Sequence, residues 1–100
     1  MDVEASRREG VLEELRRLKP HLSGRYGVTR LGVFGSVARG QATDSSDVDI
    51  VVEMTPNLFR RASVKHLLER ELGRSVDVVR YSASMNAALR ERIDREALFV

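Results

Sequence analysis

The chain has 100 residues, which is the size of one small domain and leaves no room for a separate substrate domain. A net charge of +2 and an aromatic content of 5% give no sign of a nucleic-acid-binding surface. The absence of cysteine excludes disulfides and thiolate metal sites and fits a reducing cytoplasm. No segment has the pattern of a signal peptide or approaches the ~20 apolar residues of a membrane span. We therefore expect one cytoplasmic domain over residues 1–100, with no membrane or nucleic-acid partner.

The first half of the chain predicts one helix and two strands. Leucines at helical spacing indicate an amphipathic first helix, which Pro20 is expected to kink or end. Residues 28–34 are rich in apolar and β-branched side chains and predict a strand. Residues 48–54 predict a second strand, and the polar segment between the two contains glycine and serine, as loops do.

The second half predicts a helix, a strand and a further helix. The middle helix is expected to begin at Pro56 and to stop at Gly73, a residue type favoured just after helices. Residues 75–81 predict a third strand. Ser82 or Ser84 is expected to cap the last helix. The apolar C-terminal residues are expected to be held against the core.

This order of elements predicts an α/β (α+β) fold with a small mixed sheet of three or slightly more strands, flanked by helices. The second and third strands are joined by a helix, so they should be parallel neighbours. The first and second strands are joined by a short loop, which favours an antiparallel pair. The end of the first strand, at Ser36, would then lie beside the start of the second, at Asp47.

Three aspartates interrupt the apolar strands. Asp47 and Asp49 are two residues apart, so a strand points both side chains to the same face. Asp77 lies in the third strand and can reach the same face if the strands are neighbours. Carboxylates gathered in this way need positive charge, and hard oxygen ligands are typical of Mg²⁺. The pattern therefore predicts a site for one or two Mg²⁺ ions that could serve phosphoryl or nucleotidyl transfer.

Each of these acidic residues also has a simpler interpretation. Asp47 alone would usually be a turn or cap residue, and Asp77 could face solvent on an edge strand. Asp44 is expected to form an Asx turn in the loop. Glu53 shares a face with the aspartate pair but falls at the far end of the strand.

A glycine–serine turn follows the first strand. Gly35 permits a tight turn and a close approach of the backbone to a ligand. Ser36 offers a hydroxyl and begins a helical turn whose amides favour an anion. Arg39 could reach the same anion. The pattern predicts a triphosphate-binding turn, although it contains neither a P-loop nor a dinucleotide-binding motif.

Gly35 and Ser36, followed after ten residues by Asp47-Val48-Asp49, resemble the GS-x10-D-x-D motif of the polymerase-beta nucleotidyltransferase superfamily. The longer stretch GSVARGQATDSSDVDIVV is similar to the small branch known as minimal nucleotidyltransferases. The resemblance implies that superfamily's fold over nearly the whole chain.

The resemblance also implies roles for individual residues. Gly35 and Ser36 would bind nucleotide phosphates, and Asp47 and Asp49 would bind Mg²⁺. Asp77 corresponds to the third carboxylate of the family, which would act as or orient the base for the acceptor hydroxyl.

A partner is implied as well. Minimal nucleotidyltransferases are commonly paired with a HEPN-domain toxin, and the antitoxin is thought to transfer AMP from ATP onto a tyrosine of that toxin. Two alternatives remain open, namely an antitoxin that neutralises its partner by binding alone and nucleotidyl transfer to a small molecule. Structural or surface roles are expected for four further residues: His21, His66, Tyr26 and Tyr81.

Overall fold

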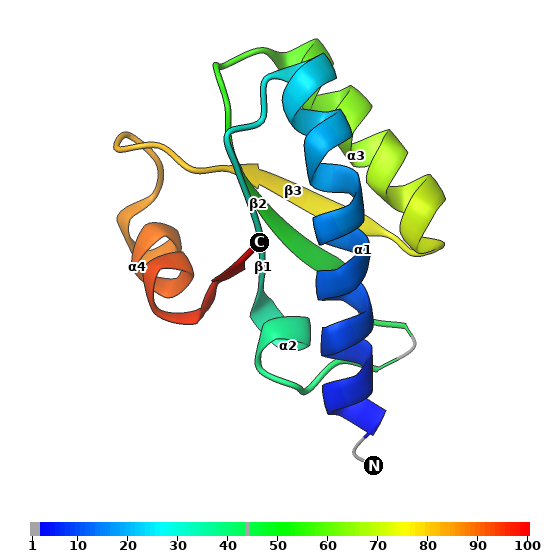
Figure 1. Ribbon diagram of the computed structural model, residues 1–100. Coiled ribbons are helices and arrows are strands. Elements are labelled where there is room, and N and C mark those ends of the chain that lie inside the picture. The colour runs from blue at the N-terminus through cyan, green and yellow to red at the C-terminus, as the bar shows by residue number, and fades with distance from the viewer. Residues whose placement is uncertain (1–2, 44) are drawn as a thin grey trace.

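The computed structural model describes residues 3–43 and 45–100 and forms a four-stranded sheet with helices on both faces (Figure 1). The elements follow in the order α1 (Val3–Tyr26), β1 (Arg30–Phe34), α2 (Gly35–Ala38), β2 (Val48–Glu53), α3 (Leu58–Leu72), β3 (Val76–Arg80), α4 (Ala87–Glu96) and β4 (Leu98–Phe99). In the described part of the chain, none of the helices combines the length and apolar character needed to cross a membrane.

The sheet has the strand order β3-β2-β1-β4, which makes β3 and β4 the edges. β1 pairs antiparallel with both β2 and β4, and β2 pairs parallel with β3. Both predicted pairings of the first three strands are therefore confirmed. The apolar C-terminus is held to the core, as expected, because it forms β4.

Figure 1 shows α1 and α3 on one face of the sheet and α4 on the other. The larger core lies between the sheet and the helix pair, with Leu15 and Leu22 of α1 and Leu68 of α3 fully buried. Complete burial of a leucine side chain contributes about 2 kcal/mol. A smaller cluster on the other face joins Phe34 and Val51 to Ile93 of α4.

Of the two outcomes expected at Pro20, a kink or an end of the first helix, the end is wrong, because α1 continues to Tyr26. Proline removes one helical hydrogen bond, which leaves the carbonyl of Arg16 without its usual partner. Arg16 and Pro20 are both exposed, so water can reach that carbonyl. Continuing the helix places Leu22 in the core, where it is fully buried, and Gly27 (φ +72°) then follows the helix.

The predicted caps are partly correct. Gly73 ends α3 in the left-handed conformation, as predicted. The same helix begins at Leu58, not at Pro56, because the Asn57 side chain accepts a hydrogen bond from the backbone N–H of Arg60. Likewise α4 is capped by Asn86 and not by Ser82 or Ser84, since the Asn86 side chain accepts a hydrogen bond from the backbone N–H of Leu89.

Candidate active site

The turn between β1 and α2 lies directly against the second strand. Gly35 begins α2 with φ +72°, a conformation that favours glycine. A Cβ atom added at Gly35 would lie 3.0 Å from Cγ of Asp49 and would collide with its carboxylate oxygen. The glycine is therefore needed both for the backbone conformation and for the close approach of the turn to Asp49.

The sheet register brings two of the aspartates together. Asp49 is the register partner of Asp77 in the parallel β2–β3 pair and of Phe34 at the end of β1. Asp49 is half-buried, whereas Asp77 is exposed on the edge strand. Asp47 is exposed and lies just before β2.

The electrostatics of Asp49 reflect this gathering of carboxylates. Burial raises the pKa of Asp49 above its ordinary value, and the neighbouring charges of Asp77 and Asp47 raise it further. Arg92 and Arg39 act in the opposite direction and reduce the rise. The ionised form of Asp49 is therefore destabilised in the protein without a ligand, and a bound cation at this place would stabilise it.

An anion from the protein itself lies at the turn. The backbone N–H of Gly35 donates a hydrogen bond to Oε2 of Glu96 at 3.3 Å. Nη1 of Arg39 donates to both oxygens of Glu96, at 3.0 and 3.1 Å. Desolvation works to raise the pKa of Glu96, but Arg39, the Gly35 N–H and Arg92 together lower it below its ordinary value. The amide and guanidinium that were predicted to bind phosphate therefore already hold a carboxylate.

Arg74 fixes the loop that leads into Asp47. Its Nη2 donates to the carbonyl oxygens of Thr43 at 2.9 Å and of Ser46 at 2.6 Å. Because one guanidinium binds both carbonyls, it holds the turn just before Asp47 against the start of β3. Arg74 is therefore a candidate positioning residue for Asp47.

The donor set fits a magnesium ion that is shared with a substrate. Among the residues the structure describes, no three acidic or histidine side chains are arranged to hold a metal by themselves. Mg²⁺ is commonly bound by one or two carboxylates, with water and substrate phosphates completing the shell. Asp47 and Asp49 could supply these carboxylates, and the raised pKa of Asp49 shows a place where a cation would be favourable.

The structure thus brings Gly35, Ser36, Asp49 and Asp77 to one end of the sheet, with Asp47 and Arg39 beside them. Of the other acidic residues considered in the sequence, Glu53 lies elsewhere. Glu53 is at the far end of β2, where it faces Arg30 at 3.5 Å. Asp44 falls outside the described residues.

Sequence reasoning missed three charged residues of this region: Arg74, Arg92 and Glu96. Helical and loop arginines or glutamates usually face solvent, so nothing in their spacing marked them. A weak signal was available for Glu96, which lies in the last helical turn before the apolar C-terminus. The antiparallel pairing of that C-terminus with β1 carries this helical turn to Gly35.

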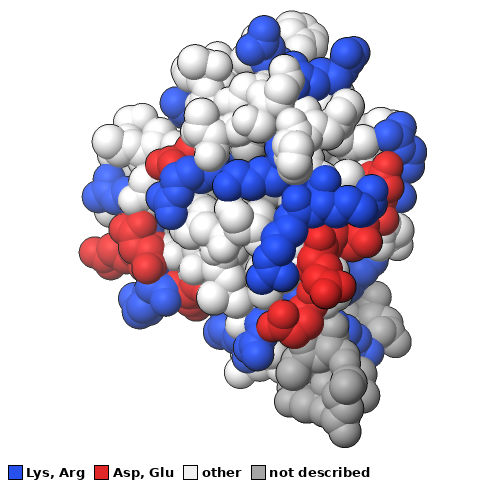
Figure 2. All heavy atoms as spheres, viewed as in Figure 1, with Lys and Arg blue, Asp and Glu red and all other residues white. Residues whose placement is uncertain are grey.

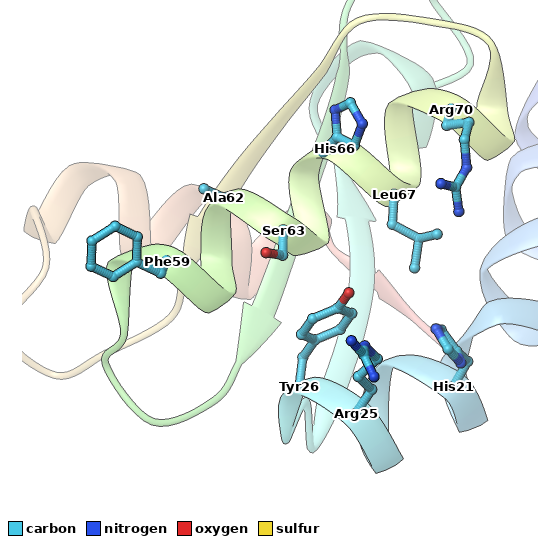
Figure 3. Close-up of a pocket in the computed structure, with 9 residues that line it drawn as sticks. All are labelled: His21, Arg25, Tyr26, Phe59, Ala62, Ser63, His66, Leu67 and Arg70. Atoms are coloured by element: carbon cyan, nitrogen blue, oxygen red, sulfur yellow. The ribbon is translucent and has the colours of Figure 1, made fainter.

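A pocket of about 550 Å³ lies apart from these residues, between the C-terminal end of α1 and α3 (Figure 3). His21 and Tyr26 line it from α1 and His66 lines it from α3. Both histidines are exposed, which agrees with the surface role expected of them. Tyr81 donates a hydrogen bond from its hydroxyl to Asp94 at 2.8 Å, a structural contact.

Figure 2 shows basic and acidic side chains next to one another on the face viewed in Figure 1. No single-sign surface covers this face, which agrees with the nearly balanced composition.

Comparison with known proteins places these residues in a family. Residues 9–99 match the family described as "Nucleotidyltransferase domain". Protein adenylyltransferase MntA of Thermococcus cleftensis is 39% identical over 95 residues, which is 89% of this chain and 95% of that protein.

Solved structures of similar fold point to the same family. A structure of a minimal nucleotidyltransferase is 40% identical, has a TM-score of 0.67, and is matched over 98% of this chain and 95% of that one. A complex of tri-AMPylated Shewanella oneidensis HEPN toxin with MNT antitoxin contains a chain of similar fold, at a TM-score of 0.58 and 18% identity over 96% of this chain and 70% of that one. The chain belongs to the nucleotidyltransferase domain family, in its minimal nucleotidyltransferase branch, and is a nucleotidyltransferase.

Proposed function

We propose that this chain uses Mg²⁺ and ATP to transfer AMP to a tyrosine hydroxyl of a HEPN toxin and so acts as the antitoxin. The observation that carries the proposal is the contact of the Gly35 turn with Asp49, which itself pairs with Asp77. A phosphate-binding turn and an acidic pair at one end of a sheet are what a nucleotidyl transfer needs. The adenylyltransferase name of the 39% identical relative supports AMP as the group transferred.

The reaction is a displacement at the α-phosphorus of ATP. The acceptor oxygen forms a bond to that phosphorus, and the bond from it to the β-phosphate oxygen breaks. Pyrophosphate leaves with the electron pair, and the proton of the acceptor hydroxyl passes to a carboxylate or to water. Asp77 is exposed on the edge strand beside Asp49, so we assign it to accept that proton or to orient the hydroxyl.

The other residues bind and align the nucleotide. Asp47 and Asp49 would hold Mg²⁺ together with phosphate oxygens, and Asp77 is a further ligand where two ions bind. When bound, the ion neutralises charge on the reacting phosphates. Gly35 and Ser36 would lie against the β- and γ-phosphates. Arg39 would exchange Glu96 for a phosphate, because a guanidinium donates charge-assisted hydrogen bonds to either anion.

The choice of partner rests on the structural relative. The MNT antitoxin of similar fold is bound to an AMPylated HEPN toxin. The same kind of partner would place this chain in a toxin–antitoxin pair.

The test is to incubate the chain with ATP, Mg²⁺ and a HEPN-domain protein and to map AMP adducts by mass spectrometry. The proposal predicts AMP on a tyrosine of the HEPN protein and loss of the adduct with Asp49→Asn. An unmodified HEPN protein whose ribonuclease activity is nevertheless inhibited, equally by wild type and Asp49→Asn, would show neutralisation by binding alone. AMP found only on a small hydroxylated compound would assign a different acceptor.

A further inference from the structure

A second pocket, of about 260 Å³, lies at the free edge of the sheet, between α3 and β3. Its lining residues are Leu58, Arg61, Ala62, Lys65, Asp77 and Val78. Asp77 is also the register partner of Asp49. The edge pocket, as we call it, therefore adjoins the acidic pair on the side that is away from the Gly35 turn.

Two cations of the edge pocket are not ion-paired within the described residues, although the carboxylate of Asp77 also lines the pocket. Arg61 and Lys65 are four residues apart on α3, so their side chains lie on one face of that helix. Within residues 3–43 and 45–100, neither side chain forms an ion pair or a hydrogen bond. Arg17, Arg39 and Arg74, by contrast, are all bonded to other residues. The edge pocket thus presents positive charge that the chain itself does not use.

The backbone of β3 is also available there. The carbonyl of Ser75 accepts from Val48 N–H at 2.9 Å, and Tyr81 N–H donates to the carbonyl of Val52 at 2.8 Å. Backbone groups alternate in direction along a strand, so the odd-numbered residues of β3 face β2. The N–H and C=O of Val78 face the opposite way, toward the free edge. On the same edge, the N–H of Val76 already donates to Oε2 of Glu69 at 3.1 Å, so pairing with an additional extended segment is open at Val78.

Apolar surface completes the edge pocket. Leu58 is 69% exposed at the start of α3 although it is a large apolar residue. Leu58 and Ala62 line the edge pocket together with the two cations. Its surface thus offers an apolar contact, two positive charges and a backbone donor–acceptor pair, which are the three parts of a site for an extended acidic peptide.

We propose that the edge pocket binds the acceptor: an extended polypeptide segment that pairs with β3 at Val78 and places an acidic side chain between Arg61 and Lys65. The hydroxyl that receives the nucleotide then lies at Asp77, the residue that the edge pocket shares with the carboxylate pair. This inference rests on the proposed function, since it names the class of acceptor for that reaction. It makes Arg61 and Lys65 specificity-determining residues that do not take part in the chemical step.

Peptide binding tests the edge pocket without any transfer reaction. A labelled peptide of about ten residues would carry β-branched residues, one tyrosine and flanking glutamates, and its twin would carry lysines in place of the glutamates. Fluorescence anisotropy would be measured for wild type, for Arg61→Glu with Lys65→Glu, and for a matched control, Arg16→Glu with Arg60→Glu. Both control residues are exposed, lie outside the edge pocket and change the net charge equally.

The expected result is that wild type and the control bind the glutamate peptide, and that the double variant binds it roughly tenfold or more weakly. The lysine twin should show the opposite order. Equal affinity of the glutamate peptide for all three proteins overturns the proposal. So does the absence of binding to wild type at about 1 mM peptide.

Transfer kinetics separate this inference from the proposed function. With a HEPN-domain protein that accepts AMP, the double variant should raise KM for that acceptor roughly tenfold, while KM for ATP stays unchanged. If the double variant transfers AMP with an unaltered KM for the acceptor, the edge pocket is not the acceptor site, and the proposed function stays intact. If no protein accepts AMP but the glutamate peptide still binds through Arg61 and Lys65, the proposed function fails and the edge pocket remains as a peptide-binding site.

Discussion

Substitution of Gly35 by alanine would perturb the proposed active site at its closest internal contact. The residue has φ +72°, and a Cβ atom there would lie 3.0 Å from Cγ of Asp49 and would collide with the carboxylate. The chain must therefore either move the turn away from β2 or rotate the Asp49 side chain. Both movements separate the proposed phosphate-binding turn from the proposed metal ligand.

The magnitude has two parts. Holding a residue with a Cβ atom in the left-handed region costs roughly 1–2 kcal/mol. For a domain of this size, each kcal/mol lowers Tm by roughly 4–8 °C. The displacement of Asp49 affects activity separately, because a misplacement of about 1 Å at a catalytic group costs on the order of 100-fold in rate.

Gly73→Ala is the matched control. Gly73 has φ +66°, so alanine pays the same backbone cost, but no atom lies within 4 Å of its added Cβ. Thermal unfolding and the steady-state rate of AMP transfer should be measured for both variants. We expect both to lose stability and only Gly35→Ala to lose activity, by roughly 100-fold in kcat. Equal transfer rates for the two variants would refute the argument that the turn must touch Asp49.

Three further changes test the charges of the site. Asp49→Asn should raise Tm at neutral pH, because the raised pKa of Asp49 means that its ionised form destabilises the folded protein. In thermal unfolding scans at decreasing pH, this gain in Tm should shrink as the pH approaches 3.8, the ordinary pKa of the group. Glu96→Gln should lower Tm at neutral pH, because a lowered pKa stabilises the fold above the ordinary value of 4.5 and this contribution is lost on acidification. The same variant should bind ATP more tightly by calorimetry, since Arg39 is released, and unchanged ATP affinity would argue against phosphate binding by Arg39. Arg74→Ala should lower kcat roughly tenfold and raise the Mg²⁺ concentration needed for half-maximal rate, because the loop that positions Asp47 loses its two hydrogen bonds to Arg74. Arg74→Lys should recover part of this loss. If Arg74→Ala lowers stability but leaves the Mg²⁺ requirement unchanged, Arg74 has a structural role only.

Much of the fold could be predicted because local signals and tertiary packing agree. The alternation of apolar residues in 48–54 and the left-handed stop at Gly73 follow from single elements. The parallel and antiparallel pairings follow from the lengths of the connections. Pro20 was the clearest conflict, and there the burial of Leu22 outweighed the local helix-breaking tendency.

The sequence indicated the acidic part of the candidate site more clearly than its basic part. Aspartates inside apolar strands are costly, so Asp49 and Asp77 stood out against their neighbours. Arg39 was correctly placed near the turn, but its partner Glu96 is 57 residues away in the chain. Such contacts depend on how α4 packs and leave no periodic pattern. The same holds for Arg74 and for the unpaired cations of the edge pocket.

Transfer from ATP labelled on the α-phosphate, compared with transfer from ATP labelled on the γ-phosphate, tests most directly whether the chain is a nucleotidyltransferase that uses Asp47 and Asp49. The reaction would contain Mg²⁺, a HEPN-domain protein, and either wild type or Asp47→Ala with Asp49→Ala. Nucleotidyl transfer at these aspartates predicts that wild type transfers the α-label alone, that the double variant transfers nothing, and that chelation of Mg²⁺ also stops transfer. Transfer of the γ-label, or of the α-label by the double variant, would contradict nucleotidyl transfer at these aspartates.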